Sequence, residues 1–122
     1  MAKVLIVDDE DNNRYLLTTL LHHAGHSTVE AATGAAGAQA AEMELPDLIV
    51  VDLSLPDIPG TELIRRIRQG ERTSTLPIAI YTATQLTPAI EEIVEIYGIR
   101  GIIPKPADAQ TVLKSFEKLL SR

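Results

Sequence analysis

The sequence predicts one α/β domain, in which a doubly wound parallel sheet carries helices on both faces. Short apolar runs alternate five times with stretches whose apolar residues recur at helical spacing. Three of these runs, at residues 4–7, 48–51 and 78–81, are apolar almost throughout, as strands buried on both faces are. Because no linker, repeat or low-complexity tract separates the βα units, we expect all five to share one parallel sheet.

The first half of the chain should hold strand 4–7, a helix over 11–25, strand 27–31 and a helix over 33–44. In the first helix several leucines and Ala24 share one face, and Gly25 is suited to end the helix. The second strand has Val29 among small or polar neighbours, which favours a place at the edge of the sheet. Gly37 weakens the second helix by roughly 0.5–1 kcal/mol relative to alanine.

The second half should hold strand 48–51, a short helix around 63–67, strand 78–81, a helix from Pro88 to Gly98, strand 101–103 and a last helix after Asp108. A loop with Pro56, Pro59 and Gly60 precedes the short helix. Proline costs little at the start of a helix, and aspartate is a suitable N-cap. The last helix should direct inward Val112, Leu113, Phe116, Leu119 and Leu120.

Composition excludes several classes of function. The 122 residues carry 11 basic and 17 acidic side chains, a net charge of −6, with no Cys. The absence of Cys excludes a disulfide framework, a thiolate zinc site and a cysteine nucleophile. The acidic net charge argues against nucleic acid as a partner, because phosphate contacts need basic side chains. Neither a secretory signal nor a run long enough to span a membrane is present, so we expect a cytoplasmic protein without a membrane partner.

Polar side chains follow four of the five predicted strands. Asp8 and Asp9 come after the first strand, Asp52 after the third, Thr82 after the fourth and Lys105 after the fifth. In an open parallel sheet the carboxyl ends of the strands lie at one edge, so we expect these residues to converge.

Such a group of residues suits phosphoryl transfer onto an aspartate. Three carboxylates in one pocket repel one another, and a divalent cation would relieve that cost. Hard oxygen ligands indicate Mg²⁺. A lysine and a threonine hydroxyl can contact an anionic group, and a carboxylate can itself be the nucleophile.

The sequence resembles the CheY-like receiver domain of bacterial two-component response regulators. The resemblance rests on VLIVDDE (4–10), DLIVVDLSLPDIPG (47–60), the Thr82-Ala83 pair and Lys105-Pro106, and it covers the whole chain. It implies a flavodoxin-like doubly wound (βα)5 fold whose five-stranded parallel sheet has the order 2-1-3-4-5. It also implies a single receiver domain over residues 1–122, with no output domain.

By this resemblance, Asp52 is the phosphoacceptor, and Thr82 and Lys105 contact the phosphoryl oxygens. The Lys105–Pro106 peptide bond is expected to be cis, although only about 5–6% of X–Pro bonds are.

The resemblance also implies a Mg²⁺ site. Asp9 would bind the ion directly, Asp8 would help to hold it through water, and Asp52 would share it. The backbone carbonyl of Ser54 would complete the protein ligands.

The implied function is a phosphoacceptor signalling switch. A sensor histidine kinase or a histidine phosphotransfer protein would supply the phosphoryl group from a phosphohistidine, and the modified domain would change its affinity for a downstream protein partner. The protein would be no turnover enzyme, since it would catalyse only its own phosphorylation and dephosphorylation.

One position departs from the family. An aromatic residue usually stands three residues before the lysine, and here that residue is Ile102. Ile102 can supply neither a ring nor a hydroxyl to the family's usual threonine–aromatic switch, so we expect the signal to travel through the loop 83–87 and the helix after it. Ser54 and Thr84 stand where the family tunes hydrolysis of the phosphoryl group.

Three other functions stay open. The chain could be a degenerate receiver that acts as a phosphorylation-independent scaffold. It could be a Mg²⁺-dependent phosphatase with an aspartate nucleophile, although such enzymes commonly have an acid where Ser54 stands. A nucleotide- or flavin-binding module is disfavoured, because the turn at 8–11 has no phosphate cradle.

Two further clusters have plain interpretations. His22, His23 and His26 are expected at an exposed helix end, because no acid or Cys completes a metal-ligand set nearby. Arg65, Arg66 and Arg68 are expected on a solvated helix face; the alternative is an anion site.

Overall fold

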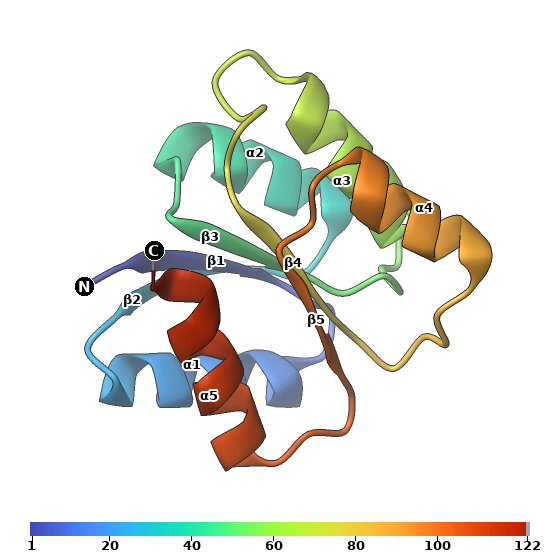
Figure 1. Ribbon diagram of the computed structural model, residues 1–122. Coiled ribbons are helices and arrows are strands. Elements are labelled where there is room, and N and C mark those ends of the chain that lie inside the picture. Colours follow the sequence, from blue (N-terminus) through green and yellow to red (C-terminus); the bar gives the residue numbers. More distant parts are fainter. Residues whose placement is uncertain (122) are drawn as a thin grey trace.

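Five parallel strands form one sheet in the order β2-β1-β3-β4-β5, and a helix follows each strand (Figure 1). This computed structural model describes residues 1–121. The strands are β1 (Lys3–Val7), β2 (Ser27–Ala31), β3 (Leu48–Val51), β4 (Ile78–Thr82) and β5 (Gly101–Pro104). The helices are α1 (Asp11–His23), α2 (Gly34–Glu44), α3 (Gly60–Gln69), α4 (Pro88–Ile96) and α5 (Ala109–Leu120). The flavodoxin-like order is confirmed, and β2 is an edge strand as predicted.

Two apolar layers hold the helices on the sheet. Side chains alternate along a strand, so Leu5 and Val7 face one side of β1 and Val4 and Ile6 face the other. The first side packs against α2, α3 and α4, and the second packs against α1 and α5 (Figure 1). The buried residues of β3 and β4 divide between the two layers in the same way.

Four helices have other ends than predicted: α3 spans Gly60–Gln69 rather than about 63–67, α4 stops at Ile96 before Gly98, and α1 and α2 differ as well. Helix α1 stops at His23, and Gly25 lies beyond it in the left-handed region with φ +94°. Ala24 is therefore exposed, and its predicted place on the buried face was wrong. Helix α2 begins one residue late, because Thr33 is its N-cap and accepts a hydrogen bond from the N–H of Ala36 at 3.0 Å.

One arginine of α3 was predicted wrongly as solvated. Arg65 and Arg66 do pair with Glu62 on the outer side of the helix. Arg68, however, is half-buried and donates hydrogen bonds to the backbone carbonyls of Leu76 and Tyr97, both at 2.7 Å. Its guanidinium thus links α3 to the segment before β4 and to the end of α4.

Helix α4 is attached more loosely than the other helices. Its half-buried residues Ile90 and Val94 pack against the core, yet none of its residues is fully buried. The hydrogen bond from Arg68 to the Tyr97 carbonyl adds a polar contact at the end of this helix. Within residues 1–121, no helix combines the length and apolar character needed to cross a membrane.

Candidate functional site

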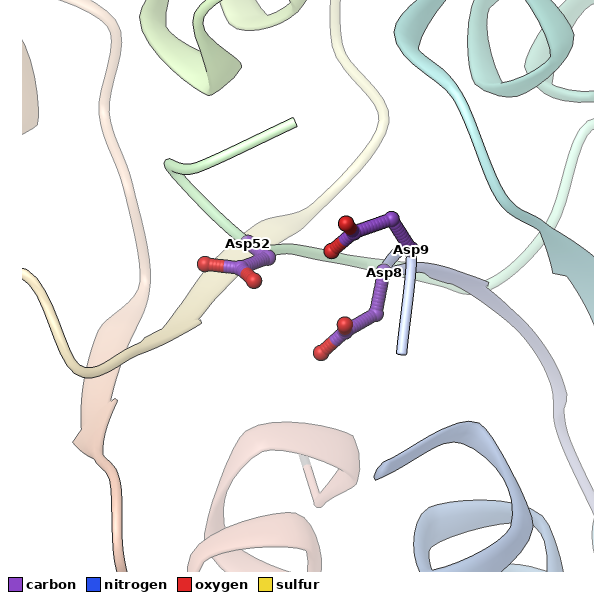
Figure 2. A group of neighbouring side chains, drawn as sticks. All are labelled: Asp8, Asp9 and Asp52. Carbon is purple, nitrogen blue, oxygen red and sulfur yellow. The ribbon is translucent and has the colours of Figure 1, made fainter. Parts of the chain in front are cut away.

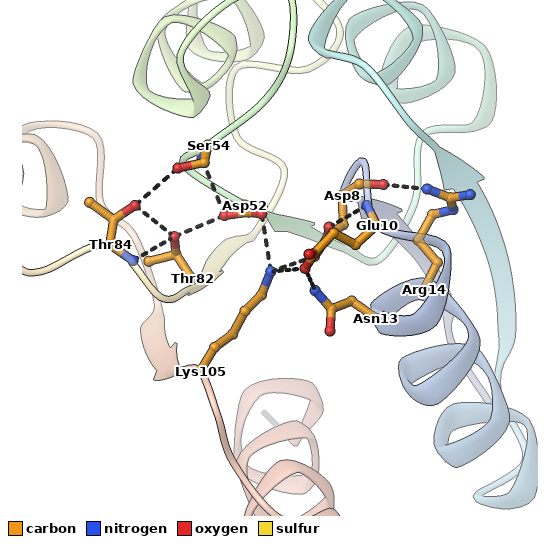
Figure 3. A network of polar contacts seen from close by, with 9 residues as sticks. All are labelled: Asp8, Glu10, Asn13, Arg14, Asp52, Ser54, Thr82, Thr84 and Lys105. Carbon is orange, nitrogen blue, oxygen red and sulfur yellow. Dashed lines mark hydrogen bonds and ion pairs between the residues drawn. The ribbon is translucent and has the colours of Figure 1, made fainter.

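The site lies where β1, β3, β4 and β5 end, as parallel pairing requires. Val7 and Val51 are register partners, so the residues that follow them, Asp8 and Asp52, stand side by side. The N–H of Asp52 donates to the carbonyl of Val7 at 3.0 Å and continues the ladder by one step. At this edge the structure brings together all five predicted residues of the strand ends: Asp8, Asp9, Asp52, Thr82 and Lys105 (Figures 2 and 3).

Three carboxylates share a small volume (Figure 2). One oxygen from each of Asp8, Asp9 and Asp52 lies within 4.8 Å of the others. Asp8 and Asp52 are only 2% and 5% exposed, whereas Asp9 is open to solvent. The negative charges of these carboxylates repel one another, and a nearby cation offsets that repulsion.

Lys105 supplies one such cation. Its Nζ lies 2.8 Å from Asp8 Oδ2 and 3.0 Å from Asp52 Oδ2, so the ammonium bridges acids from two different strands (Figure 3). Burial alone would lower the pKa of Lys105, but the hydrogen bonds and charges of the two carboxylates raise it above its ordinary value. The Tyr81 ring, whose centroid is 5.1 Å from Nζ, adds a cation–π contact.

A chain of hydroxyl groups lies on the other side of Asp52. The Thr82 hydroxyl donates to Asp52 Oδ1 at 2.8 Å and lies 3.1 Å from the hydroxyl of Thr84. That oxygen is in turn 3.3 Å from Ser54 Oγ, which closes a link between the loops after β3 and β4 (Figure 3). The Asp52 carboxylate is thus contacted by an ammonium at one oxygen and a hydroxyl at the other.

Local backbone geometry fixes the loops around the acids. A Cβ at Gly60 would lie 2.4 Å from the carbonyl oxygen of Asp52 and 2.6 Å from Leu53 Cα, so only glycine fits there. The Lys105–Pro106 bond is cis, as expected. The backbone N–H of Lys105 donates to the carbonyl of Thr82 at 2.9 Å and places the side chain beside β4.

The donor set suits a hard divalent cation. Beside the acids lies a cavity of about 310 Å³, lined by Asp9, Glu10, Asp52, Ser54, Thr82, Ala83 and Lys105. Carboxylate oxygens with room for water match the ligands that Mg²⁺ prefers. Within residues 1–121, the aspartate cluster is the one group of acids and histidines that converges in this way. Two of the three histidines bond elsewhere: His22 pairs with the Thr28 hydroxyl and His26 with the N–H of Ala2.

Sequence reasoning missed two residues around the site. Arg14, one turn into α1, donates to the backbone carbonyl of Asp8 at 2.6 Å. Asp57, in the loop after β3, accepts hydrogen bonds from the first turn of α2. The only available signals were an arginine shortly after an acidic turn and an aspartate between two prolines. Neither pattern indicates which residue the side chain contacts.

Ile102 occupies the position where the family usually has an aromatic residue. Its side chain is half-buried on β5 and packs against the core layer beneath α4. The position therefore contributes an aliphatic contact between β5 and that layer and offers no hydroxyl or ring.

Comparisons with known proteins agree with this geometry. The family model of the response regulator receiver domain matches residues 4–117. The chain belongs to the response regulator receiver domain family. Protein PilH of Pseudomonas aeruginosa is 31% identical over 125 residues, which cover 99% of each sequence. Chemotaxis protein CheY of the same organism is 32% identical over 98% of this chain and 97% of its own length. The structure of chemotaxis response regulator CheY4 of Vibrio cholerae superposes with a TM-score of 0.89 at 29% identity, covering 98% of this receiver domain and 99% of that chain.

Proposed function

We propose that this receiver domain is a phosphoacceptor switch in which Asp52 takes a phosphoryl group from a phosphohistidine. One observation carries the proposal: the buried Asp52 carboxylate is held between the Thr82 hydroxyl at 2.8 Å and the Lys105 ammonium at 3.0 Å. Both contacts are made by groups that can bind the oxygens of an arriving phosphoryl group.

Asp52 would act as the nucleophile. An Asp52 carboxylate oxygen would form a bond to phosphorus while the bond between phosphorus and the donor imidazole nitrogen breaks, and the imidazole would leave with the electron pair. Catalysis of this transfer is mainly positioning and charge stabilisation. Lys105 would offset the charge on the phosphoryl oxygens, and Thr82 would donate a hydrogen bond to one of them.

Asp8, Asp9 and Asp52, together with the Ser54 carbonyl, would hold the Mg²⁺ ion. When bound, the ion neutralises charge on the transferring phosphoryl group. The support for this assignment is the convergence of three carboxylates beside a cavity that leaves room for water and phosphate oxygens.

The donor would be a sensor histidine kinase or a histidine phosphotransfer protein, and the reaction would take place in the cytoplasm. Phosphorylation would change the affinity for a downstream protein partner. Since Thr82 contacts Asp52 and Thr84, the change would reach the loop 83–87 and the loosely attached α4. Ile102 can supply only a change of packing to this route.

Labelling with a small-molecule phosphodonor and Mg²⁺ tests the proposal. Wild type and Asp57→Asn should be labelled, and Asp52→Asn should not. Asp57 is a matched control, because it lies in the same loop but bonds to α2. Equal labelling of the Asp52 variant would refute the acceptor assignment. Absence of labelling with every donor would favour a phosphorylation-independent scaffold, and steady release of phosphate from small substrates would favour a phosphatase.

A further inference from the structure

Arg14 lies against the backbone of the turn that carries the first two acids. Its side chain is only 14% exposed, and its Nη1 donates to the carbonyl oxygen of Asp8 at 2.6 Å (Figure 3). This carbonyl belongs to the peptide unit between Asp8 and Asp9. Because a peptide unit is planar, fixing the direction of its carbonyl also fixes the plane in which the Cα atoms of Asp8 and Asp9 lie.

The charge of Arg14 is already matched by other groups. Its Nε lies 3.0 Å from Glu30 Oε1 on β2, and its Nη2 pairs with Asp11 in the first turn of α1. The acidic pocket, by contrast, has its own cation in Lys105. What Arg14 gives to the acids is therefore a hydrogen bond whose direction is fixed by the planar fork of the guanidinium, whereas an ammonium is a point charge with rotatable donors on a flexible stem.

The remaining bonds of the turn leave a place for this contact. The N–H of Asp8 donates to Ala31 on β2 at 3.0 Å, and the N–H of Glu10 donates to Asp8 Oδ1 at 2.9 Å. These bonds hold the start of the turn and the Asp8 carboxylate. Arg14 holds the peptide between Asp8 and Asp9, which neither of these two hydrogen bonds contacts.

We infer that Arg14 is a positioning residue for the Mg²⁺ site, and that Glu30 anchors it from β2. The guanidinium sets the peptide plane between Asp8 and Asp9, so that both carboxylates converge on that of Asp52. This inference rests on the proposed function, since it concerns the same ion. Partners that orient ligands commonly affect metal affinity about 10–100-fold.

Calorimetric titration with Mg²⁺ distinguishes positioning from charge, because the two predict opposite signs. Removal of a nearby positive charge alone would strengthen binding of a cation. We expect instead that Arg14→Gln and the charge-preserving Arg14→Lys both weaken Mg²⁺ binding by about tenfold. Arg66→Gln is the control, because Arg66 also pairs with a carboxylate one turn away but lies on α3, and it should bind as wild type does. Tighter or unchanged binding by both Arg14 variants would overturn the inference.

A second measurement needs no metal. In the metal-free protein the Glu10 amide proton is hydrogen-bonded to the Asp8 carboxylate, and its NMR resonance should move upfield in both Arg14 variants and stay in place in Arg66→Gln. Lower thermal stability with an unmoved Glu10 resonance would mean that Arg14 is merely structural. If wild type bound no Mg²⁺, the metal site of the proposed function would fail, and the Glu10 resonance alone would decide the role of Arg14.

Discussion

Asp57 accepts a hydrogen bond from the backbone N–H of Gly34 at 2.8 Å and so ties the loop after β3 to the first turn of α2. Its second oxygen accepts from the N–H of Ala35 at 2.9 Å. The bond from Gly34, followed by that from Ala35, holds the pKa of Asp57 below its ordinary value of 3.8. The loop that carries Asp52 is thus fastened at a second point, outside the acidic pocket.

Loss of the Asp57 charge should make the protein less stable at neutral pH. A lowered pKa in the folded state stabilises the fold above the unfolded value of 3.8, and this contribution is lost as the pH falls through the folded value. Asp57→Asn should therefore melt below wild type at pH 7, and the difference should vanish in strong acid. Thermal melts from pH 2 to 7 measure this. The control Glu71→Gln, at an exposed loop position, should follow wild type throughout.

Replacement of Gly60 should disturb the loop of the proposed phosphoacceptor. The added methyl group of Gly60→Ala would meet backbone atoms of Asp52 and Leu53, which cannot move aside without shifting the loop. We expect a loss of about 1–3 kcal/mol in the free energy of unfolding, together with slower labelling. Urea denaturation measures the first effect. Gly101→Ala, whose nearest neighbour is a flexible Leu119 methyl group at 3.1 Å, should change much less, and an equal loss in both would count against this explanation.

Removal of the Arg68 guanidinium should loosen α4. Arg68→Met keeps most of the apolar stem but leaves the carbonyls of Leu76 and Tyr97 without their donor. The free energy of unfolding should fall by about 2 kcal/mol. Relative to wild type, amide hydrogen exchange should accelerate more in α4 than in α2. The control Arg72→Met, at an exposed loop arginine, should leave the exchange rates of both helices unchanged. Uniform acceleration over the whole chain would argue against a local link.

Lys105 should compete with Mg²⁺ for the acids. Lys105→Met removes the ammonium from Asp8 and Asp52, so Mg²⁺ should bind roughly tenfold more tightly, while the metal-free protein should be less stable. Calorimetry and thermal melts measure the two effects. Weaker Mg²⁺ binding would contradict the proposed competition.

The same lysine should govern stability in alkali. Its raised pKa stabilises the fold below the unfolded value of 10.5, and this contribution is lost as the pH rises through the folded value. Stability should therefore decline less steeply above about pH 10.5 in Lys105→Met than in wild type. Lys114→Met, which removes an exposed lysine from α5, should keep the wild-type slope.

The fold could be predicted from regular patterns in the sequence, whereas contacts between side chains and distant parts of the chain could not. The apolar runs predicted the buried strands, and the sparse apolar content of 27–31 predicted the edge position of β2. Convergence of the five polar residues followed from parallel strands alone. The burial of Arg68 could not be predicted, because it depends on carbonyls of Leu76 and Tyr97 that only the fold brings near. For the same reason, the sequence did not reveal the contact of Arg14 with Glu30 on β2 or that of Asp57 with the first turn of α2.

The bridge from Lys105 to Asp8 and Asp52 spans 97 and 53 residues of the chain. Every acid of the cluster precedes β5 in the sequence, and the cation that neutralises it follows β5. A nascent chain emerging from the ribosome therefore carries all three carboxylates well before their ammonium. Until β5 and Lys105 are in place, charge repulsion among these carboxylates opposes closure of the acidic pocket, so the pocket depends on a residue that is synthesised after all of its acids.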